Sequence, residues 1–233
     1  MKQGLKILLP TAAIIIFIWV VSVPVRAAGG FDGYFRFSQV ENNVYQVMRL
    51  GGLALFVLVS YQTITGSFVP LFSRLYGPRF YRYNAVSGVT VLVLALAHLS
   101  LFIYFLNKLD FFEGFLRLAP WQFFLGPVAF LLIMAVGIRI LWAVLSKRQT
   151  LASVGGWVYW LNYLIFVFGF VHSIRMGSDI ALSSLRILWL IFAGLAAVGL
   201  VYRLFGTQPR KDKAGGRSKT TGLDISRNEH ARY

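Results

Sequence analysis

The sequence predicts an all-α integral membrane protein, a polytopic helical bundle with about six transmembrane helices. Of its 233 residues, 58% are hydrophobic and only 13% are charged, a composition that ordinary soluble domains do not have. The apolar residues gather in runs long enough to cross roughly 30 Å of hydrocarbon as helices. The formal net charge of +15 gathers between these runs, where it indicates orientation in a membrane.

The sequence also excludes several kinds of chemistry. It contains no cysteine, which rules out disulfides, thiolate metal sites and iron–sulfur ligation. The glycine pairs at 51–52 and 155–156 lie in or beside apolar runs, without the strand–turn–helix context of a phosphate-binding loop. We therefore expect no nucleotide-binding domain in these residues, and no nucleic-acid partner.

Residues 1–43 are predicted to form an N-terminal span and an outer interfacial segment. The apolar run from Ile7 to Val23 is followed at 25–28 by VRAA, which resembles a signal-peptide cleavage site. The run is longer than a usual signal core, which favours a retained span, whereas cleavage would leave five spans. Gly29–Asn43 mixes aromatic and charged residues, as interfacial segments do.

Residues 44–205 are predicted to form the transmembrane bundle. Its spans are apolar runs separated by loops, and they cover about Val44–Gly66, Asn84–Leu106, Trp121–Leu145, Trp157–Ile174 and Leu185–Leu204. The first of these contains Gly51-Gly52, where a neighbouring helix can pack closely. Phe68–Tyr83 is interpreted as a basic connection. Residues 206–233 are rich in Gly, Lys and Arg, and they predict a disordered tail that contacts anionic lipid.

Lysine and arginine are unequally distributed between the two ends of the bundle. Connections at the end that includes both termini hold about 15 of them, and the opposite connections hold about 7. Because positive loops stay in the cytoplasm, both termini are predicted to be cytoplasmic, in the inner membrane of a bacterium.

Two spans contain a single histidine each, His98 and His172, while His230 lies in the tail. An ionisable residue inside a span is costly and indicates a functional site. Both spans are predicted to run outward, which places both imidazoles in the outer half of the bilayer.

Two such imidazoles can hold a heme iron from its two faces. Each ring would donate its other N–H to a carbonyl one turn earlier in its own helix. The small residues Ala95, Ala97 and Gly169 leave room for a flat macrocycle. Interhelical hydrogen bonding and proton relay remain alternatives.

Two motifs resemble the ferric reductase-like transmembrane domain family. RYNAVSG at 82–88, followed ten residues later by His98, is similar to the family's third span. Tyr163, followed nine residues later by His172, is similar to its fifth. The resemblance covers about Arg49 to Arg203. The family includes ferric reductases, NADPH oxidases and the heme-binding membrane subunit of the periplasmic methionine sulfoxide reductase system.

The resemblance implies one b-type heme per chain, with His98 and His172 as its iron ligands. Family members with two hemes carry a second histidine pair 13 or 14 residues earlier, where this chain has Asn84 and Tyr159. An inner heme is therefore not expected.

Further site residues are predicted with weaker signals. Arg49 and Arg175 are candidates to pair with heme propionates, the alternative being that both extend to lipid headgroups. Gln62, Asn84 and Tyr159 are candidates to contact a quinone or FMN in the inner half.

These observations predict a membrane b-type cytochrome, the electron-transfer subunit of an oxidoreductase. It would take electrons from quinol or a flavin-bearing partner and pass them to an acceptor on the outer side, such as a soluble redox partner. The alternative is a non-redox polytopic protein, a transporter or assembly factor whose histidines are structural or carry protons. Heme handling or sensing is a third possibility.

Overall fold

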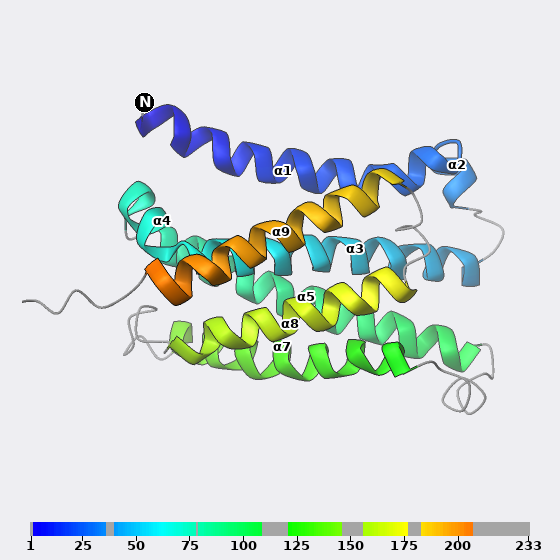
Figure 1. The fold of residues 1–233 in the computed structure, drawn as a ribbon. Coiled ribbons are helices and arrows are strands. Elements are labelled where there is room, and N and C mark those ends of the chain that lie inside the picture. The colour runs from blue at the N-terminus through cyan, green and yellow to red at the C-terminus, as the bar shows by residue number, and fades with distance from the viewer. Residues whose placement is uncertain are drawn as a thin grey trace, which may run out of the picture.

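The computed structural model describes residues 2–35, 40–77, 79–108, 121–145, 156–176 and 183–206. Within these ranges the chain forms helices and no strands, which confirms the predicted all-α class (Figure 1). The helices are α1 (Lys2–Ala27), α2 (Phe31–Tyr34), α3 (Val40–Ser67), α4 (Val69–Tyr76), α5 (Arg79–Lys108), α7 (Trp121–Leu145), α8 (Gly156–Met176) and α9 (Ser183–Gly206). The predicted basic tail lies outside the described residues, apart from Gly206, as do most of the predicted loops.

Five of these helices, α3, α5, α7, α8 and α9, are long and apolar enough to cross a membrane. They correspond to the five spans predicted within residues 44–205, so the protein is a polytopic integral membrane protein. Helix α1 has 26 residues, and the part of it whose side chains are described, Thr11–Ala27, is an apolar helix shorter than the five spans. Its assignment as a sixth span or as a cleaved signal stays a prediction.

The helices extend beyond the apolar runs that predicted them. Helix α3 begins at Val40, inside the predicted interfacial segment, and α5 begins at Arg79. The predicted basic connection Phe68–Tyr83 contains α4 and the first turn of α5, two helical segments that were not predicted. Polar residues continue a helix readily where its backbone is already hydrogen-bonded, and hydropathy alone does not detect them.

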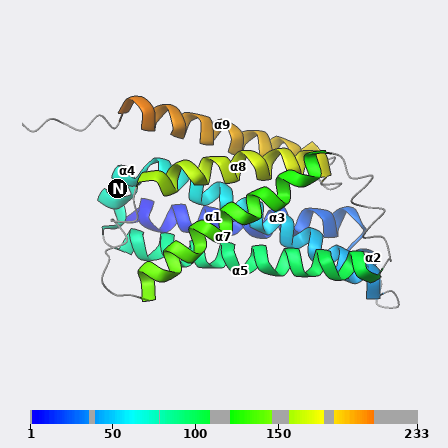
Figure 2. The ribbon, with the colours of Figure 1, turned by 90° about the horizontal axis from the view of Figure 1, so that it is seen from below.

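The five spans alternate in direction, and four of them form a ring in which α3 packs on α5, α5 on α7, α7 on α8, and α8 on α3 (Figures 1 and 2). Helices α1 and α9 pack on α3 from outside this ring. The start of α1 and the end of α9 lie at the same end of the bundle, beside α4. The charge distribution predicts that this end is cytoplasmic and that the opposite end, where α3 and α7 begin, faces outward.

Helix α3 is the most enclosed of the five spans. Half of its most apolar window is buried (50%), against 22% to 28% in the other four. Its predicted cytoplasmic half buries polar side chains, namely Ser60, Gln62, Thr63, Thr65 and Ser67. The four hydroxyls each donate to the carbonyl four residues earlier in α3. These bonds satisfy the hydroxyls inside the membrane, where an unpaired polar group is costly.

Candidate cofactor site

The ring of α3, α5, α7 and α8 encloses a cavity of about 520 Å³ in its predicted outer half. This volume lies within the range of small-molecule and cofactor sites, roughly 300–1,000 Å³. The walls are almost entirely aliphatic and aromatic. The polar side chains along them include His98, His172, Ser173 and Arg49. A largely apolar cavity with a few polar groups is the usual form of a cofactor site.

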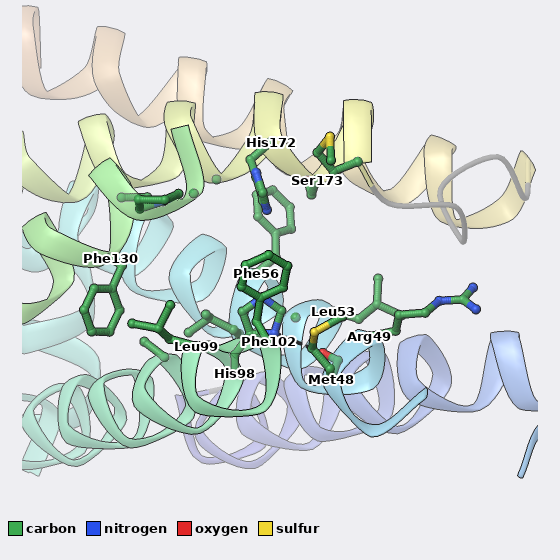
Figure 3. A pocket seen from close by; sticks show the side chains of 18 of the residues that line it. Met48, Arg49, Leu53, Phe56, His98, Leu99, Phe102, Phe130, His172 and Ser173 are labelled. Carbon is green, nitrogen blue, oxygen red and sulfur yellow. Dashed lines mark hydrogen bonds between the residues drawn. The ribbon is translucent and has the colours of Figure 1, made fainter. Parts of the chain in front are cut away.

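His98 and His172 approach this cavity from opposite sides (Figure 3). His98 comes from α5 and His172 from α8, and their side chains point toward the space between the two helices. The structure thus brings together the two histidines on which the sequence analysis depends.

In each imidazole, Nδ1 is hydrogen-bonded to a backbone carbonyl. Nδ1 of His98 lies 3.0 Å from the carbonyl oxygen of Met48, and Nδ1 of His172 lies 3.4 Å from that of Gln122. A carbonyl only accepts, so these bonds require the proton on Nδ1 and leave Nε2 with its lone pair. We expected carbonyls one turn earlier in the same helix, and this was wrong. The acceptors belong to the neighbouring helices α3 and α7.

Two glycines allow the rings to come this close. A Cβ atom on Gly52 would lie 3.0 Å from Cε1 of His98, and one on Gly126 would lie 2.8 Å from Cε1 of His172. Both distances are too short for any side chain at these positions unless the ring moves. Each histidine therefore lies over a glycine of the next helix and donates to the carbonyl four residues before that glycine.

The cavity is built from two equivalent helix pairs. Gly126 lies 74 residues after Gly52, and His172 lies 74 residues after His98. The pairs run in the same direction, since α3 and α7 both begin at the predicted outer end and α5 and α8 both end there. Internal repeats of this kind occur in membrane proteins. Further lining residues obey the same offset, as in Phe56 and Phe130, Ala95 and Gly169, and Phe102 and Met176.

The role of these glycines was only partly visible in the sequence. Gly51-Gly52 was recognised as a place for close packing, but Cβ on Gly51 would meet no atom within 4 Å. Gly126 and the two acceptor carbonyls were missed, because they depend on which helices become neighbours. The constant offset between the two glycine–histidine pairs is the signal that can reveal them.

The two candidate arginines differ in position. Arg49 lines the cavity, and its side chain extends toward the predicted outer end (Figure 3). Its guanidinium lies over the Tyr45 ring, 5.3 Å from the centroid, and donates to Oε1 of Gln46 at 3.0 Å. Arg175 is exposed at the end of α8 and is not among the residues that line the cavity. The structure therefore brings Arg49 to the site, and it does not bring Arg175 there.

An aromatic cluster supports the His172 side of the cavity. Trp189 of α9 is fully buried and stacks on Phe56, with centroids 4.7 Å apart and an interplanar angle of 23°. Its indole N–H donates to Oγ of Ser173 at 2.8 Å, and that hydroxyl donates to the carbonyl of Phe170. Trp189 thus connects α9 to the residue that follows His172.

The inner half of the ring is much more tightly filled. A second cavity, beside Gln62 and Gly88, measures only about 10 Å³, the space of about one water molecule. Gln62 donates to Ser87 Oγ at 3.1 Å. Asn84 and Tyr159 line neither cavity.

The resemblance described above implies that Asn84 and Tyr159 stand where two-heme members of that family have their second histidine pair. Oδ1 of Asn84 is buried and has no hydrogen-bond partner among the described residues. The Tyr159 ring lies against Gly66, and the Arg203 guanidinium is 4.2 Å from its centroid. These contacts leave Tyr159 directed at α3 and α9. A quinone or FMN near Gln62, Asn84 and Tyr159 stays a prediction, and it would require these side chains to move.

Comparisons with known protein families, with curated proteins and with solved structures find no match to this chain. The described residues also contain no group of three or more His, Cys, Asp or Glu side chains able to hold a metal ion. A heme iron needs fewer protein ligands than a metal ion held by side chains alone. The porphyrin provides four nitrogen ligands, and the protein provides the remaining one or two.

Proposed function

We propose that this protein is a membrane b-type cytochrome that holds one heme between His98 and His172 and passes electrons through it. The observation that carries the proposal is the pair of equivalent histidines facing one cavity, each over a glycine and each with Nδ1 committed to a carbonyl. The resemblance to the ferric reductase-like family supports the same assignment.

The residues present fit such a group. Nδ1–H donation to a carbonyl fixes the neutral tautomer, orients the ring and makes Nε2 a better ligand. Neutral imidazole nitrogens are suitable ligands for iron. The two equivalent halves of the cavity match a flat macrocycle that is approached alike on both faces. The walls, which include Phe56 and Phe130, are mostly apolar, as suits a macrocycle.

The chain's own residues favour electron transfer over chemistry at the metal. Heme supplies one-electron exchange when it is bound. His98 and His172 would both be used to hold the group, which suits electron transfer and leaves neither histidine to act on a substrate. Arg49, at the predicted outer edge of the cavity, is placed to pair with a carboxylate by a charge-assisted hydrogen bond.

The location of the cavity supports a direction for the electrons. It lies in the half of the bundle predicted to face outward, so an acceptor on that side, such as a soluble redox partner, would be close to it. Membrane quinol or a flavin-bearing partner would be the donor. In this proposal the protein is the electron-transfer subunit of a bacterial inner-membrane oxidoreductase.

An absorption spectrum of the purified full-length protein, oxidised and then reduced, tests the proposal. We expect the spectrum of a low-spin b-type cytochrome with both axial positions filled. A colourless preparation from heme-replete cells would contradict it. That result would favour a transporter or assembly factor whose histidines only hydrogen-bond between helices, as Nδ1 of each already does.

A further inference from the structure

We propose that the elbow between α4 and α5 is a binding site for an anionic phospholipid headgroup. The elbow is defined by Leu71, Arg74, Arg79, Arg82 and Tyr83. It lies at the predicted cytoplasmic end of the bundle, where α3 leaves the membrane and α5 enters it (Figure 1). This proposal does not depend on heme binding.

The geometry of the elbow is fixed by its backbone and by stacked rings. Gly77 ends α4 with a φ of 63°, a left-handed conformation that favours glycine. Its N–H donates to the Ser73 carbonyl at 2.8 Å, and the Phe80 N–H donates to the Gly77 carbonyl at 3.1 Å. The rings of Phe72 and Phe80 stack across the turn, 5.7 Å apart and 10° from parallel. The arginines on either side of the turn are therefore held in one neighbourhood.

The three arginines are exposed, and no described acidic residue neutralises them. Arg74 lies on α4, and Arg79 and Arg82 lie in the first turn of α5. Among the residues whose side chains the structure describes, Asp32 is the only acid, and it lies in α2 at the opposite end of the bundle. Several arginines beside a membrane span attract anionic headgroups.

The exposed apolar side chains beside these arginines identify a lipid as the occupant. Leu71 is 58% exposed, Tyr83 is 56% exposed and Val86, one turn further along α5, is 61% exposed. Helix α4 buries none of its residues completely, so it lies on the bundle as an amphipathic interfacial helix does. A site with cations at headgroup level and apolar side chains beside them fits a phospholipid, which has both a charged headgroup and acyl chains. Free phosphate would contact only the cations.

Native mass spectrometry of the full-length protein in detergent, titrated with phosphatidylglycerol or with phosphatidylcholine of the same acyl chains, measures this site. We expect phosphatidylglycerol to bind at least about tenfold more tightly, and millimolar inorganic phosphate not to displace it. Each arginine near the headgroup should contribute about fivefold in affinity. The triple variant Arg74→Gln, Arg79→Gln, Arg82→Gln should therefore bind phosphatidylglycerol on the order of 100-fold more weakly.

A matched control removes the same charge from the opposite end. Arg26, Lys108 and Arg186 are exposed at the ends of α1 and α5 and at the start of α9. Changing all three to Gln should alter phosphatidylglycerol affinity by less than about threefold, because single exposed cations bind weakly. Equal losses in the two triple variants, or equal affinity for the two lipids in the wild type, would overturn the proposal.

Two further variants keep the test decisive if the glutamine variant is unstable. Changing the three elbow arginines to Lys keeps the charge and should keep the preference for phosphatidylglycerol. Leu71→Ser keeps all charges but removes the apolar anchor, and it should weaken phosphatidylglycerol binding about threefold to tenfold. Unchanged binding in Leu71→Ser together with displacement by inorganic phosphate would assign the site to free phosphate and overturn the lipid assignment.

Discussion

His98 and His172 each have one ring nitrogen committed to a neighbouring helix and a second one, Nε2, with its lone pair. This division of roles is what a metal-ligating imidazole requires, since one nitrogen orients the ring and the other binds. A histidine that only joins two helices needs the hydrogen bond from Nδ1 to the neighbouring helix, but it does not need a cavity beside its ring. The cavity of about 520 Å³ beside both rings is therefore the feature that a purely structural role leaves unexplained.

Replacing either histidine tests whether it binds heme or only joins two helices. His98→Ala or His172→Ala removes one axial ligand, so we expect loss of the heme or a weakly held high-spin form in the absorption spectrum. His230→Ala, which changes the third histidine of the chain, should leave the spectrum unchanged. A normal low-spin spectrum in both single variants would contradict the assignment of His98 and His172 as heme ligands.

The glycines that pack against the histidine rings, Gly52 and Gly126, allow a second test of the site. In Gly126→Ala the new Cβ would lie 2.8 Å from the His172 ring, and in Gly52→Ala it would lie 3.0 Å from the His98 ring. Displacing a packed ring costs about 1–3 kcal/mol, so both variants should melt at lower temperature and retain less heme per protein.

Gly51→Ala is the matched control for these variants, because a Cβ there meets no atom within 4 Å. It should be neutral or stabilising by up to about 1 kcal/mol, the difference in helix propensity between the two residues. Equal heme loss in Gly51→Ala and Gly52→Ala would show that close packing of the ring is not the cause.

Helix α9 lies outside the ring that forms the cavity, and Trp189 connects it to that ring. The indole ring stacks on Phe56 of α3 and its N–H donates to Ser173 of α8. Trp189→Phe keeps most of the stacked area and loses one hydrogen bond, which costs about 0.5–1.5 kcal/mol. Trp189→Ala also loses the buried ring, which costs about 3–5 kcal/mol. Thermal melting in detergent should rank the variants in that order, and equal melting of Trp189→Ala and wild type would contradict this role of α9.

The direction of the spans decides on which side of the membrane the cavity lies. The asymmetry of Lys and Arg predicts that reporters fused after Leu145 and after Arg203 are cytoplasmic and that one fused after Lys108 is external. A cytoplasmic reporter after Lys108 would reverse the predicted position of the cavity and of the electron acceptor. The elbow of α4 and α5 would then face outward.

For the whole molecule, most of the fold was predictable because long apolar runs in a membrane have few alternatives to a helix. The five spans were found in the right places. Helix α4 was missed, since eight amphipathic residues with an arginine resemble a basic loop. The polar starts of α3 and α5 were missed for a related reason, as the backbone continues its hydrogen bonds beyond the apolar core.

The site was predictable only in its ionisable residues. His98 and His172 stand out in the sequence because each is the single histidine of an apolar span. The carbonyls of Met48 and Gln122 and the packing of Gly126 are properties of helix pairs, which no single span contains. Arg175 was a plausible cavity residue by its proximity to His172, but it is exposed at the end of α8 and does not line the cavity.

The two halves of the ring differ in the space they enclose. The predicted outer half has a cavity of about 520 Å³, and the inner cavity beside Gln62 has about 10 Å³. In the inner half, Tyr159 packs on Gly66 and beneath Arg203. An Asn amide such as that of Asn84 is a poor iron ligand, and a Tyr phenol would have to ionise, which burial disfavours. Of these two cavities, the outer one alone has room for a large cofactor.

The amount of heme per chain in the purified full-length protein tests this conclusion most directly. Heme is extracted and quantified against protein from amino-acid analysis, after expression in heme-replete cells. One heme per chain is the predicted result, and it should fall toward zero in the double variant His98→Ala, His172→Ala. A value near zero in the wild type would contradict the assignment of the cavity, and a value near two would contradict the closed inner half.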